Sequence, residues 1–292
     1  MKGIVYCLLM VCCYVIGCQE EKVTSNSPYP GFTYLRTATY SCGGVTNTVQ
    51  EFRHEKTGME FVLIPGGTFT MGSPNTEADR DRDEMQHSVT LSPYLISKTE
   101  VTQAVWERIM GINPSFFKGP ERPVEKVSWN DCVSFCEKVG LALPTEAQWE
   151  FAARAGTQSV YYWGQAFELS QCNSASYWAK QVLRNMDEHR QFDFDSKWQS
   201  LGAGRTSVGK FPPNAYGLYD MAGNVFEWCY DRYGAYSSNS ATNPTGPTSG
   251  ARRVYRGGSW DAPAGRLRSA FRGVGGPGLA DYDLGFRVLA RP

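Results

Sequence analysis

The side chains that most often act as nucleophiles, bases or metal ligands are few and scattered in this sequence. The chain has three histidines, His54, His87 and His189. Among the cysteines beyond residue 18, no two have the Cys-x-x-Cys spacing of a zinc site and none has a histidine beside it. These residue types make a zinc centre improbable. The five cysteines are Cys42, Cys132, Cys136, Cys172 and Cys229.

Three carboxylates on predicted helices, Asp131, Glu146 and Glu150, could in principle supply paired acid–base catalysis. A structural role is favoured, because carboxylates near the start of a helix are stabilised by its dipole. Cys132 and Cys136 lie one helical turn apart, and a free cysteine commonly packs as a small hydrophobe. We therefore predict that both thiols belong to the core.

The elements that would have to position a site are short and divided by turns. Among 292 residues the chain has 30 glycines, 16 prolines and 8 tryptophans, which indicates a loop-rich domain with aromatic packing. Thr145 and Gln148 have the spacing of a capping box at the start of a helix. The apolar patterns predict strands over 59–69, 68–71 and 88–97, helices over 100–109 and 129–139 and from 146 onward, a solvated loop over 77–84, and long loops over 161–204.

The charge balance excludes one class of partner. Lysine plus arginine (29) equals aspartate plus glutamate (29), so no basic excess favours nucleic acid. Block-like runs of one charge are also absent from the sequence.

The first 18 residues have the pattern of a secretory signal: a short positive start and an apolar run over 4–16 that is too short to span a bilayer. The run ends Val15-Ile16-Gly17-Cys18, which resembles a bacterial lipobox and implies that Cys18 is lipidated. An ordinary signal peptide with a stray cysteine is the alternative. We expect a lipoprotein anchored in the bacterial cell envelope, at the outer-membrane surface. Residues 19–50 are expected to form a tether, with room for a short strand near 32–40, and residues 51–292 the folded domain.

Several segments resemble the formylglycine-generating-enzyme family, and they follow one another in that family's order. The two most specific are residues 143–154 (LPTEAQWEFAAR) and 214–228 (NAYGLYDMAGNVFEW). The others are residues 61–72 (FVLIPGGTFTMG), 100–102 (EVT), 123–124 (PV), 127–129 (VSW), 256–260 (RGGSW) and 285–287 (GFR). The resemblance implies an α+β domain with a C-type-lectin-like fold, short antiparallel sheets, two to three helices and many loops.

The resemblance also implies a cofactor and a chemistry. On the family pattern a calcium ion would be bound by Asp220, Gly223, Val225 and Glu227, and oxygen ligands suit this hard cation. Alternatively, Asn224 and Glu227 only brace a turn. The family's oxidase activity needs two reactive cysteines, but Ala262 stands where the first would be and residues 261–291 contain no cysteine. We therefore predict that the protein is not such an oxidase.

The C-terminal tract, residues 260–287 (WDAPAGRLRSAFRGVGGPGLADYDLGFR), resembles the variable region of proteins diversified by retroelements, including the variable protein of Treponema. In that family selected asparagine codons are randomised at their adenines between fixed scaffold codons. The implied scaffold residues are Trp260, Ala264, Leu267, Arg268, Ser269, Ala270, Arg272, Pro277, Ala280, Leu284, Gly285, Phe286 and Arg287.

The remaining positions of the tract are the implied ligand contacts. An AAC codon randomised at its adenines cannot encode Lys, Glu, Gln, Met or Trp, and none of these positions holds one. Phe271 and Tyr282 are expected to be anchors, and Arg266 to pair with acidic groups. The fifteen positions are Asp261, Ala262, Pro263, Gly265, Arg266, Phe271, Gly273, Val274, Gly275, Gly276, Gly278, Leu279, Asp281, Tyr282 and Asp283.

We therefore expect a non-catalytic, surface-displayed lipoprotein that binds a protein or glycan through this tract. An enzyme of the same superfamily with non-cysteine chemistry is the first alternative, although an iron site of two histidines and a carboxylate is difficult with three histidines. An invariant cell-envelope protein without a specific ligand is the second.

Overall fold

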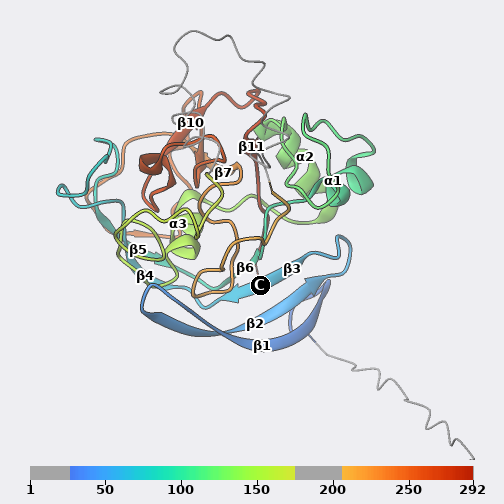
Figure 1. Cartoon of the computed structure of the whole chain (residues 1–292), viewed down its shortest axis with the longest axis horizontal. Helices are drawn as coiled ribbons and strands as arrows, with labels where there is room; N and C mark the ends of the chain where they lie inside the picture. The colour runs from blue at the N-terminus through green and yellow to red at the C-terminus, as the bar shows by residue number, and fades with distance from the viewer. Residues whose placement is uncertain (1–26, 175–205, 292) are drawn as a thin grey trace, which may run out of the picture.

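The computed structural model describes residues 27–174 and 206–291. It has three sheets and three α-helices, which confirms the predicted α+β class. In Figure 1 the strands β1 to β3 form the lower layer, and the helices and C-terminal strands lie above them. The expected signal segment with Cys18 lies outside the described residues, as do residues 175–204 of the expected loop region. In the described part no helix is long and apolar enough to cross a membrane.

The largest sheet joins both ends of the domain. Its strand order is β1-β2-β3-β6-β12, and β12 near the C-terminus pairs with β6. The first two strands form a hairpin whose turn residues, Gly43 and Gly44, both have positive φ (58° and 78°), as a two-residue primed turn requires. The bounds are β1 Phe32–Cys42, β2 Val45–His54, β3 Glu60–Ile64, β6 Tyr94–Ser97 and β12 Leu289–Ala290.

The hairpin corrects the expected boundary of the domain at residue 51. Phe32, Val49 and Phe52 are buried in the main core, so residues 32–50 belong to the fold and not to a tether. Alternation of threonine with larger residues in β1 and β2 is typical of a half-buried strand pair. A polar composition on the open face conceals this alternation in the sequence.

Two smaller sheets complete the framework. One has the order β4-β5-β8 and the other β10-β9-β7-β11. The single strand expected over 88–97 is in fact β5 and β6, which belong to different sheets, because Pro93 has no N–H to continue a ladder. The bounds are β4 Gly67–Met71, β5 His87–Leu91, β7 Phe226–Arg232, β8 Ala241–Thr242, β9 Arg253–Arg256, β10 Gly273–Gly275 and β11 Leu284–Gly285.

The helices are α1 (Gln103–Met110), α2 (Trp129–Val139) and α3 (Glu146–Arg154). The predicted capping box of Thr145 and Gln148 is confirmed at α3, and Ser128 forms a second box with Asp131 at α2. The expected helix from residue 100 begins only at Gln103, because Thr102 caps it.

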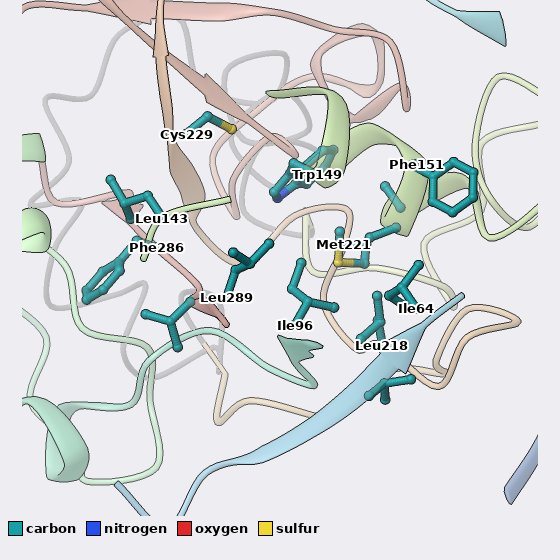
Figure 2. Close-up of a cluster of buried hydrophobic side chains, with 14 of the residues drawn as sticks. Ile64, Ile96, Leu143, Trp149, Phe151, Leu218, Met221, Cys229, Phe286 and Leu289 are labelled. Carbon is teal, nitrogen blue, oxygen red and sulfur yellow. The ribbon is translucent and has the colours of Figure 1, made fainter. Parts of the chain in front are cut away.

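One aromatic core holds the three sheets and the helices together. Figure 2 shows Ile64 of β3, Ile96 of β6 and Trp149 of α3 in one cluster with Phe286 and Leu289 from the C-terminal end. Cys132 and Cys136 are buried, as predicted. The core therefore fixes the C-terminal tract relative to elements far away in the sequence.

The corrected boundary can be tested with fragments. A fragment that begins at residue 51 lacks β1 and most of β2, and with them Phe32 and Val49. Because burying each such side chain contributes roughly 2 kcal/mol, we expect the thermal midpoint to fall by about 10 °C or more. A fragment of residues 27–292 is the control and should unfold with the full chain in calorimetry. Equal midpoints for the two fragments would show that the hairpin is not part of the fold.

Candidate ligand-binding site

Four buried arginines fix the C-terminal tract and the strand that precedes it. Arg256 precedes the tract, Arg268 and Arg272 lie within it, and Arg287 ends it; all are 5% exposed or less. Each pairs with a glutamate from an earlier element. A buried charge without a partner is costly, so these pairs determine where the tract lies.

Arg268 joins the tract to the loop over 77–84. Its Nη2 and Nη1 atoms donate to the two oxygens of Glu84 at 2.7 and 2.8 Å, and Nη1 also donates to Glu77 at 2.8 Å. Burial raises the pKa of Glu84, but hydrogen bonds from Arg268 and Ser73 outweigh burial and the pKa is lowered. The expectation of a solvated loop is therefore wrong for Glu84, whose charge is compensated by a residue 184 positions away.

Arg272 and Arg256 join the tract to α3. The Nε and Nη2 atoms of Arg272 donate to the carboxylate of Glu146 at 2.7 and 2.9 Å. Arg256 donates to Glu150 and to the backbone oxygen of Ala270, and so holds the main chain of the tract directly. Glu146 and Glu150 are thus structural residues held in ion pairs. The sequence analysis favoured a structural role on the basis of the helix dipole, but it did not identify Arg272 and Arg256 as their partners.

At the far end Arg287 pairs with Glu227 of β7. Its Nε and Nη2 atoms donate to the two oxygens of Glu227 at 2.6 and 2.8 Å. Trp149 also donates to this carboxylate, at 2.7 Å. The backbone of Asn224, in the turn before β7, accepts a hydrogen bond from the Trp260 amide at 2.9 Å. The turn over 220–227 therefore positions the start and the end of the tract.

Two of the calcium ligands implied by the family, Asp220 and Glu227, already have hydrogen-bond partners in this structure. Both oxygens of Glu227 accept hydrogen bonds from Arg287, whose positive charge already neutralises the carboxylate. Oδ2 of Asp220 accepts from the Gly209 amide, and burial raises the Asp220 pKa to about 6. Within the described residues no group of three or more acidic, histidine or cysteine side chains has a metal-binding arrangement. The arrangement instead matches the alternative in which Glu227 braces the turn; calcium binding itself stays a prediction.

The tract divides into a buried and an exposed set. Ten of the implied scaffold residues are buried: Trp260, Leu267, Arg268, Ser269, Ala270, Arg272, Leu284, Gly285, Phe286 and Arg287. Ala264 and Pro277 are half-buried and Ala280 is exposed. Of the implied contact positions, twelve are half-buried or exposed: Asp261, Pro263, Gly265, Arg266, Phe271, Val274, Gly276, Gly278, Leu279, Asp281, Tyr282 and Asp283. We call these twelve the exposed face.

Three of the implied contact positions do not reach the surface. Ala262, Gly273 and Gly275 are buried, and added side-chain atoms at Gly273 would overlap the Tyr255 ring. Phe271 is half-buried and packs on the Phe226 ring, with 6.3 Å between centroids. Tyr282, by contrast, is 43% exposed. As an aromatic anchor, Tyr282 fits the expectation better than Phe271.

An aromatic neighbour outside the tract extends this surface. Phe116, in the loop between α1 and α2, is 57% exposed and packs on Phe117. Phe117 contacts Trp260, which contacts Tyr282, with ring centroids 5.9 and 6.0 Å apart. The predicted site residues do not include Phe116 or Phe117; two adjacent aromatics in a proline-containing loop are the only signal in the sequence.

Burial disfavours the thiolate form of the described cysteines. Cys132, Cys136, Cys172 and Cys229 are buried, and burial raises the pKa of each thiol, to about 12 for Cys136 and Cys172. Ala262, which the family resemblance aligns with the first reactive cysteine, is buried. Of the two described histidines, His54 is buried and burial lowers its pKa. His189 lies outside the described residues.

Comparisons with known proteins establish the family. Residues 46–292 match the sulfatase-modifying factor enzyme 1-like domain, and the chain belongs to this family. Formylglycine-generating enzyme from Mus musculus is 35% identical over 233 residues, which cover 74% of this chain and 59% of that protein. The Thermomonospora curvata enzyme is 30% identical, with coverages of 79% and 93%. The chain thus spans less than two thirds of the mouse relative.

Solved structures confirm the expected fold. Treponema denticola variable protein 1 superposes with a TM-score of 0.65 at 29% identity, covering 88% of this chain and 100% of that chain. PvdO from Pseudomonas aeruginosa has a TM-score of 0.66 at 27% identity, with coverages of 86% and 98%. The chain therefore has the formylglycine-generating-enzyme type of fold, which similar proteins use both as enzymes and as a variable protein.

The structural role of the buried arginines can be tested within the tract. Arg268→Gln should cost about 3–5 kcal/mol in the free energy of unfolding, because Glu84 would be left buried without its partner. The difference in stability should shrink as pH falls, for two reasons. Protonation of Glu84 removes the unpaired buried charge in the variant, and it also weakens the ion pair with Arg268 in the wild type. Urea denaturation at several pH values measures both effects.

Arg266→Gln is the matched control, since Arg266 is exposed and lies only two positions away. A change within about 0.5 kcal/mol is expected there. If both substitutions cost the same, the buried pair does not hold the tract.

Proposed function

We propose that this protein binds a ligand through the exposed face of the C-terminal tract and has no oxidase activity. The main support is the division of the tract. Its arginines are buried in ion pairs, while most positions that the family pattern assigns to variation are at least partly accessible. Substitutions at such positions can change ligand contacts while leaving the ion pairs in place. Similarity to the Treponema denticola variable protein is in accord with this role.

The chemistry of the exposed face suits a protein or glycan ligand. Tyr282 and Leu279 provide apolar area, at 43% and 40% exposure, and Arg266 adds a positive charge. Tyrosine and arginine are common anchors in binding surfaces, because each combines contact area with hydrogen bonding. The glycines around Leu279 add backbone that can follow different ligands.

Formylglycine-generating enzymes are among the relatives at 30–35% identity, which favours a second candidate: an enzyme of the same superfamily with non-cysteine chemistry. Oxidase chemistry of the family type is disfavoured by the sequence itself, since Cys229 is its last cysteine. A thiolate would therefore have to come from an earlier cysteine; among the described ones Cys42 is half-buried and the others are buried, and burial raises the pKa of each thiol.

The proposal includes diversification of the tract by a retroelement. Sequencing the 3′ end of the gene and its flanking DNA in many isolates tests it. We expect adenine-specific variation at the twelve codons of the exposed face, with only small residues at Ala262, Gly273 and Gly275, where space is lacking. A nearby reverse transcriptase gene and an invariant template copy should accompany it. An invariant tract without a template would reject diversification and leave a binder of fixed specificity, an enzyme or an envelope protein.

We also propose that the domain is displayed at the outer-membrane surface by a lipid anchor on Cys18. More than one acyl chain gives stable membrane attachment. In cells fed labelled fatty acid, the full chain should become labelled, whereas Cys18→Ser should not, and Cys13→Ser should behave like the wild type. Labelling that survives Cys18→Ser would place the lipid elsewhere.

A further inference from the structure

Arg253 of β9 differs from the buried arginines that hold the tract, because it has no carboxylate partner among the residues that the structure describes. Its guanidinium lies 3.6 Å from the ring centroid of Trp129. Nη1 donates to the backbone oxygen of Tyr230 at 2.8 Å, and in the described part of the chain no carboxylate lies within ion-pair distance of Arg253. Within the described ranges Nε of Arg253 is buried and has no hydrogen-bond partner, so the donors left for a ligand are those of the two terminal nitrogens, apart from the bond to Tyr230.

The surroundings of Arg253 are positive and aromatic. Arg232 pairs with Arg253 across β7 and β9, and Arg252 beside it is exposed. Within the described residues no carboxylate lies within ion-pair distance of any of these three arginines. The neighbouring acid, Asp231, is buried and accepts from the Glu146 amide, and burial raises its pKa to about 8.

The guanidinium lies over the Trp129 ring, and the Tyr230 ring lies beside that of Trp129. Their ring centroids are 6.3 Å apart, Tyr230 is 46% exposed and Trp129 is half-buried. The orientation of the Trp129 ring is fixed by a hydrogen bond that its Nε1 donates to the Cys229 backbone oxygen at 2.9 Å. Tryptophan, tyrosine and arginine are the residue types that most often dominate binding energy in protein interfaces. We call Trp129, Tyr230 and Arg253 the basic aromatic cluster.

The cluster lies beside the C-terminal tract. Arg253 is the register partner of Gly275 in the β9–β10 ladder, and the amide of Asn130, next to Trp129, donates to the oxygen of Pro277 at 3.3 Å. Leu279 packs over Gly275 and is 40% exposed. A ligand on this end of the exposed face would therefore meet the cluster.

We propose that the basic aromatic cluster is a fixed subsite that binds a carboxylate side chain of a polypeptide ligand. This proposal rests on the proposed function, because the rest of the same polypeptide ligand would contact the exposed face. A carboxylate can accept two parallel hydrogen bonds from the open end of a guanidinium, and the two rings would cover the pair from solvent. Because these three residues lie outside the tract, the subsite would stay constant while the tract varies.

The probes for the test are two short capped peptides, acetyl-Tyr-Glu-Gly-amide and acetyl-Tyr-Gln-Gly-amide, and sodium sulfate at equal ionic strength. Nuclear magnetic resonance follows the Trp129 indole N–H and the Arg253 Nε–H of the full domain. We expect saturable shifts with the glutamate peptide and about tenfold weaker binding of the glutamine peptide, as for loss of one charged hydrogen-bond pair. Equal binding of both peptides would overturn the proposal, as would sulfate that saturates the same shifts at the same concentration.

Variants separate the subsite from general charge and from the tract. Arg253→Gln should weaken the glutamate peptide about tenfold, and Arg253→Lys, which keeps the charge without the planar fork, should also weaken it. Arg252→Gln is the matched control and should bind within about twofold of wild type. An equal loss in Arg252→Gln would mean unspecific attraction and sink the subsite.

Tyr282→Ala, on the exposed face, should leave binding of the short peptide unchanged. If the subsite does not exist, Arg253→Gln will leave binding of the glutamate peptide unchanged. The exposed face could then still bind a ligand, so the proposed function would stand. If the proposed function is wrong, no ligand will bind to the exposed face, whether or not the glutamate peptide binds to the basic aromatic cluster. Thermal midpoints of every variant check that the domain is folded, and Arg253→Lys serves if Arg253→Gln does not fold.

Discussion

The cost of burying an arginine without a carboxylate is the constraint on which this structure depends. Arg256, Arg268, Arg272 and Arg287 are all buried, and each depends on a glutamate from α3, β7 or the loop over 77–84. Removing one member of such a pair is expensive, because the remaining charge has already lost its water. The C-terminal tract therefore cannot leave its place without breaking several pairs together, although it contains little regular secondary structure of its own.

This arrangement separates stability from ligand contact within one segment. The arginines point into the domain and carry the attachment, while the neighbouring positions reach the surface at least in part. Three positions limit the freedom of the surface, because Ala262, Gly273 and Gly275 are packed against other residues. A rigid scaffold with adaptable positions between fixed ones is what a binding surface of changeable specificity requires. The basic aromatic cluster beside the tract would add one contact that does not change.

Much of the local structure could be predicted because the physical cause is local. The capping box at α3, the bounds of α2 and the burial of Cys132 and Cys136 follow from side chains within one or two helical turns of each other. Errors occurred where the cause is distant. The β1–β2 hairpin reads as polar linker until its apolar residues meet the core, and strand 88–97 divides at Pro93 between two sheets.

By itself the sequence determined the family and the α+β class, since ordered motifs carry this information, and it predicted that the family's reactive cysteines are absent. Through the resemblance to variable proteins it also predicted which residues of the tract are scaffold and which are contact positions. Only the tertiary structure decided which of them reach the surface, that Glu84 is buried against Arg268, and that Arg287 occupies the carboxylate of Glu227. Each of these depends on partners from 60 to 184 residues apart, and such pairings are decided by desolvation and packing in three dimensions, which leave no local pattern in the sequence.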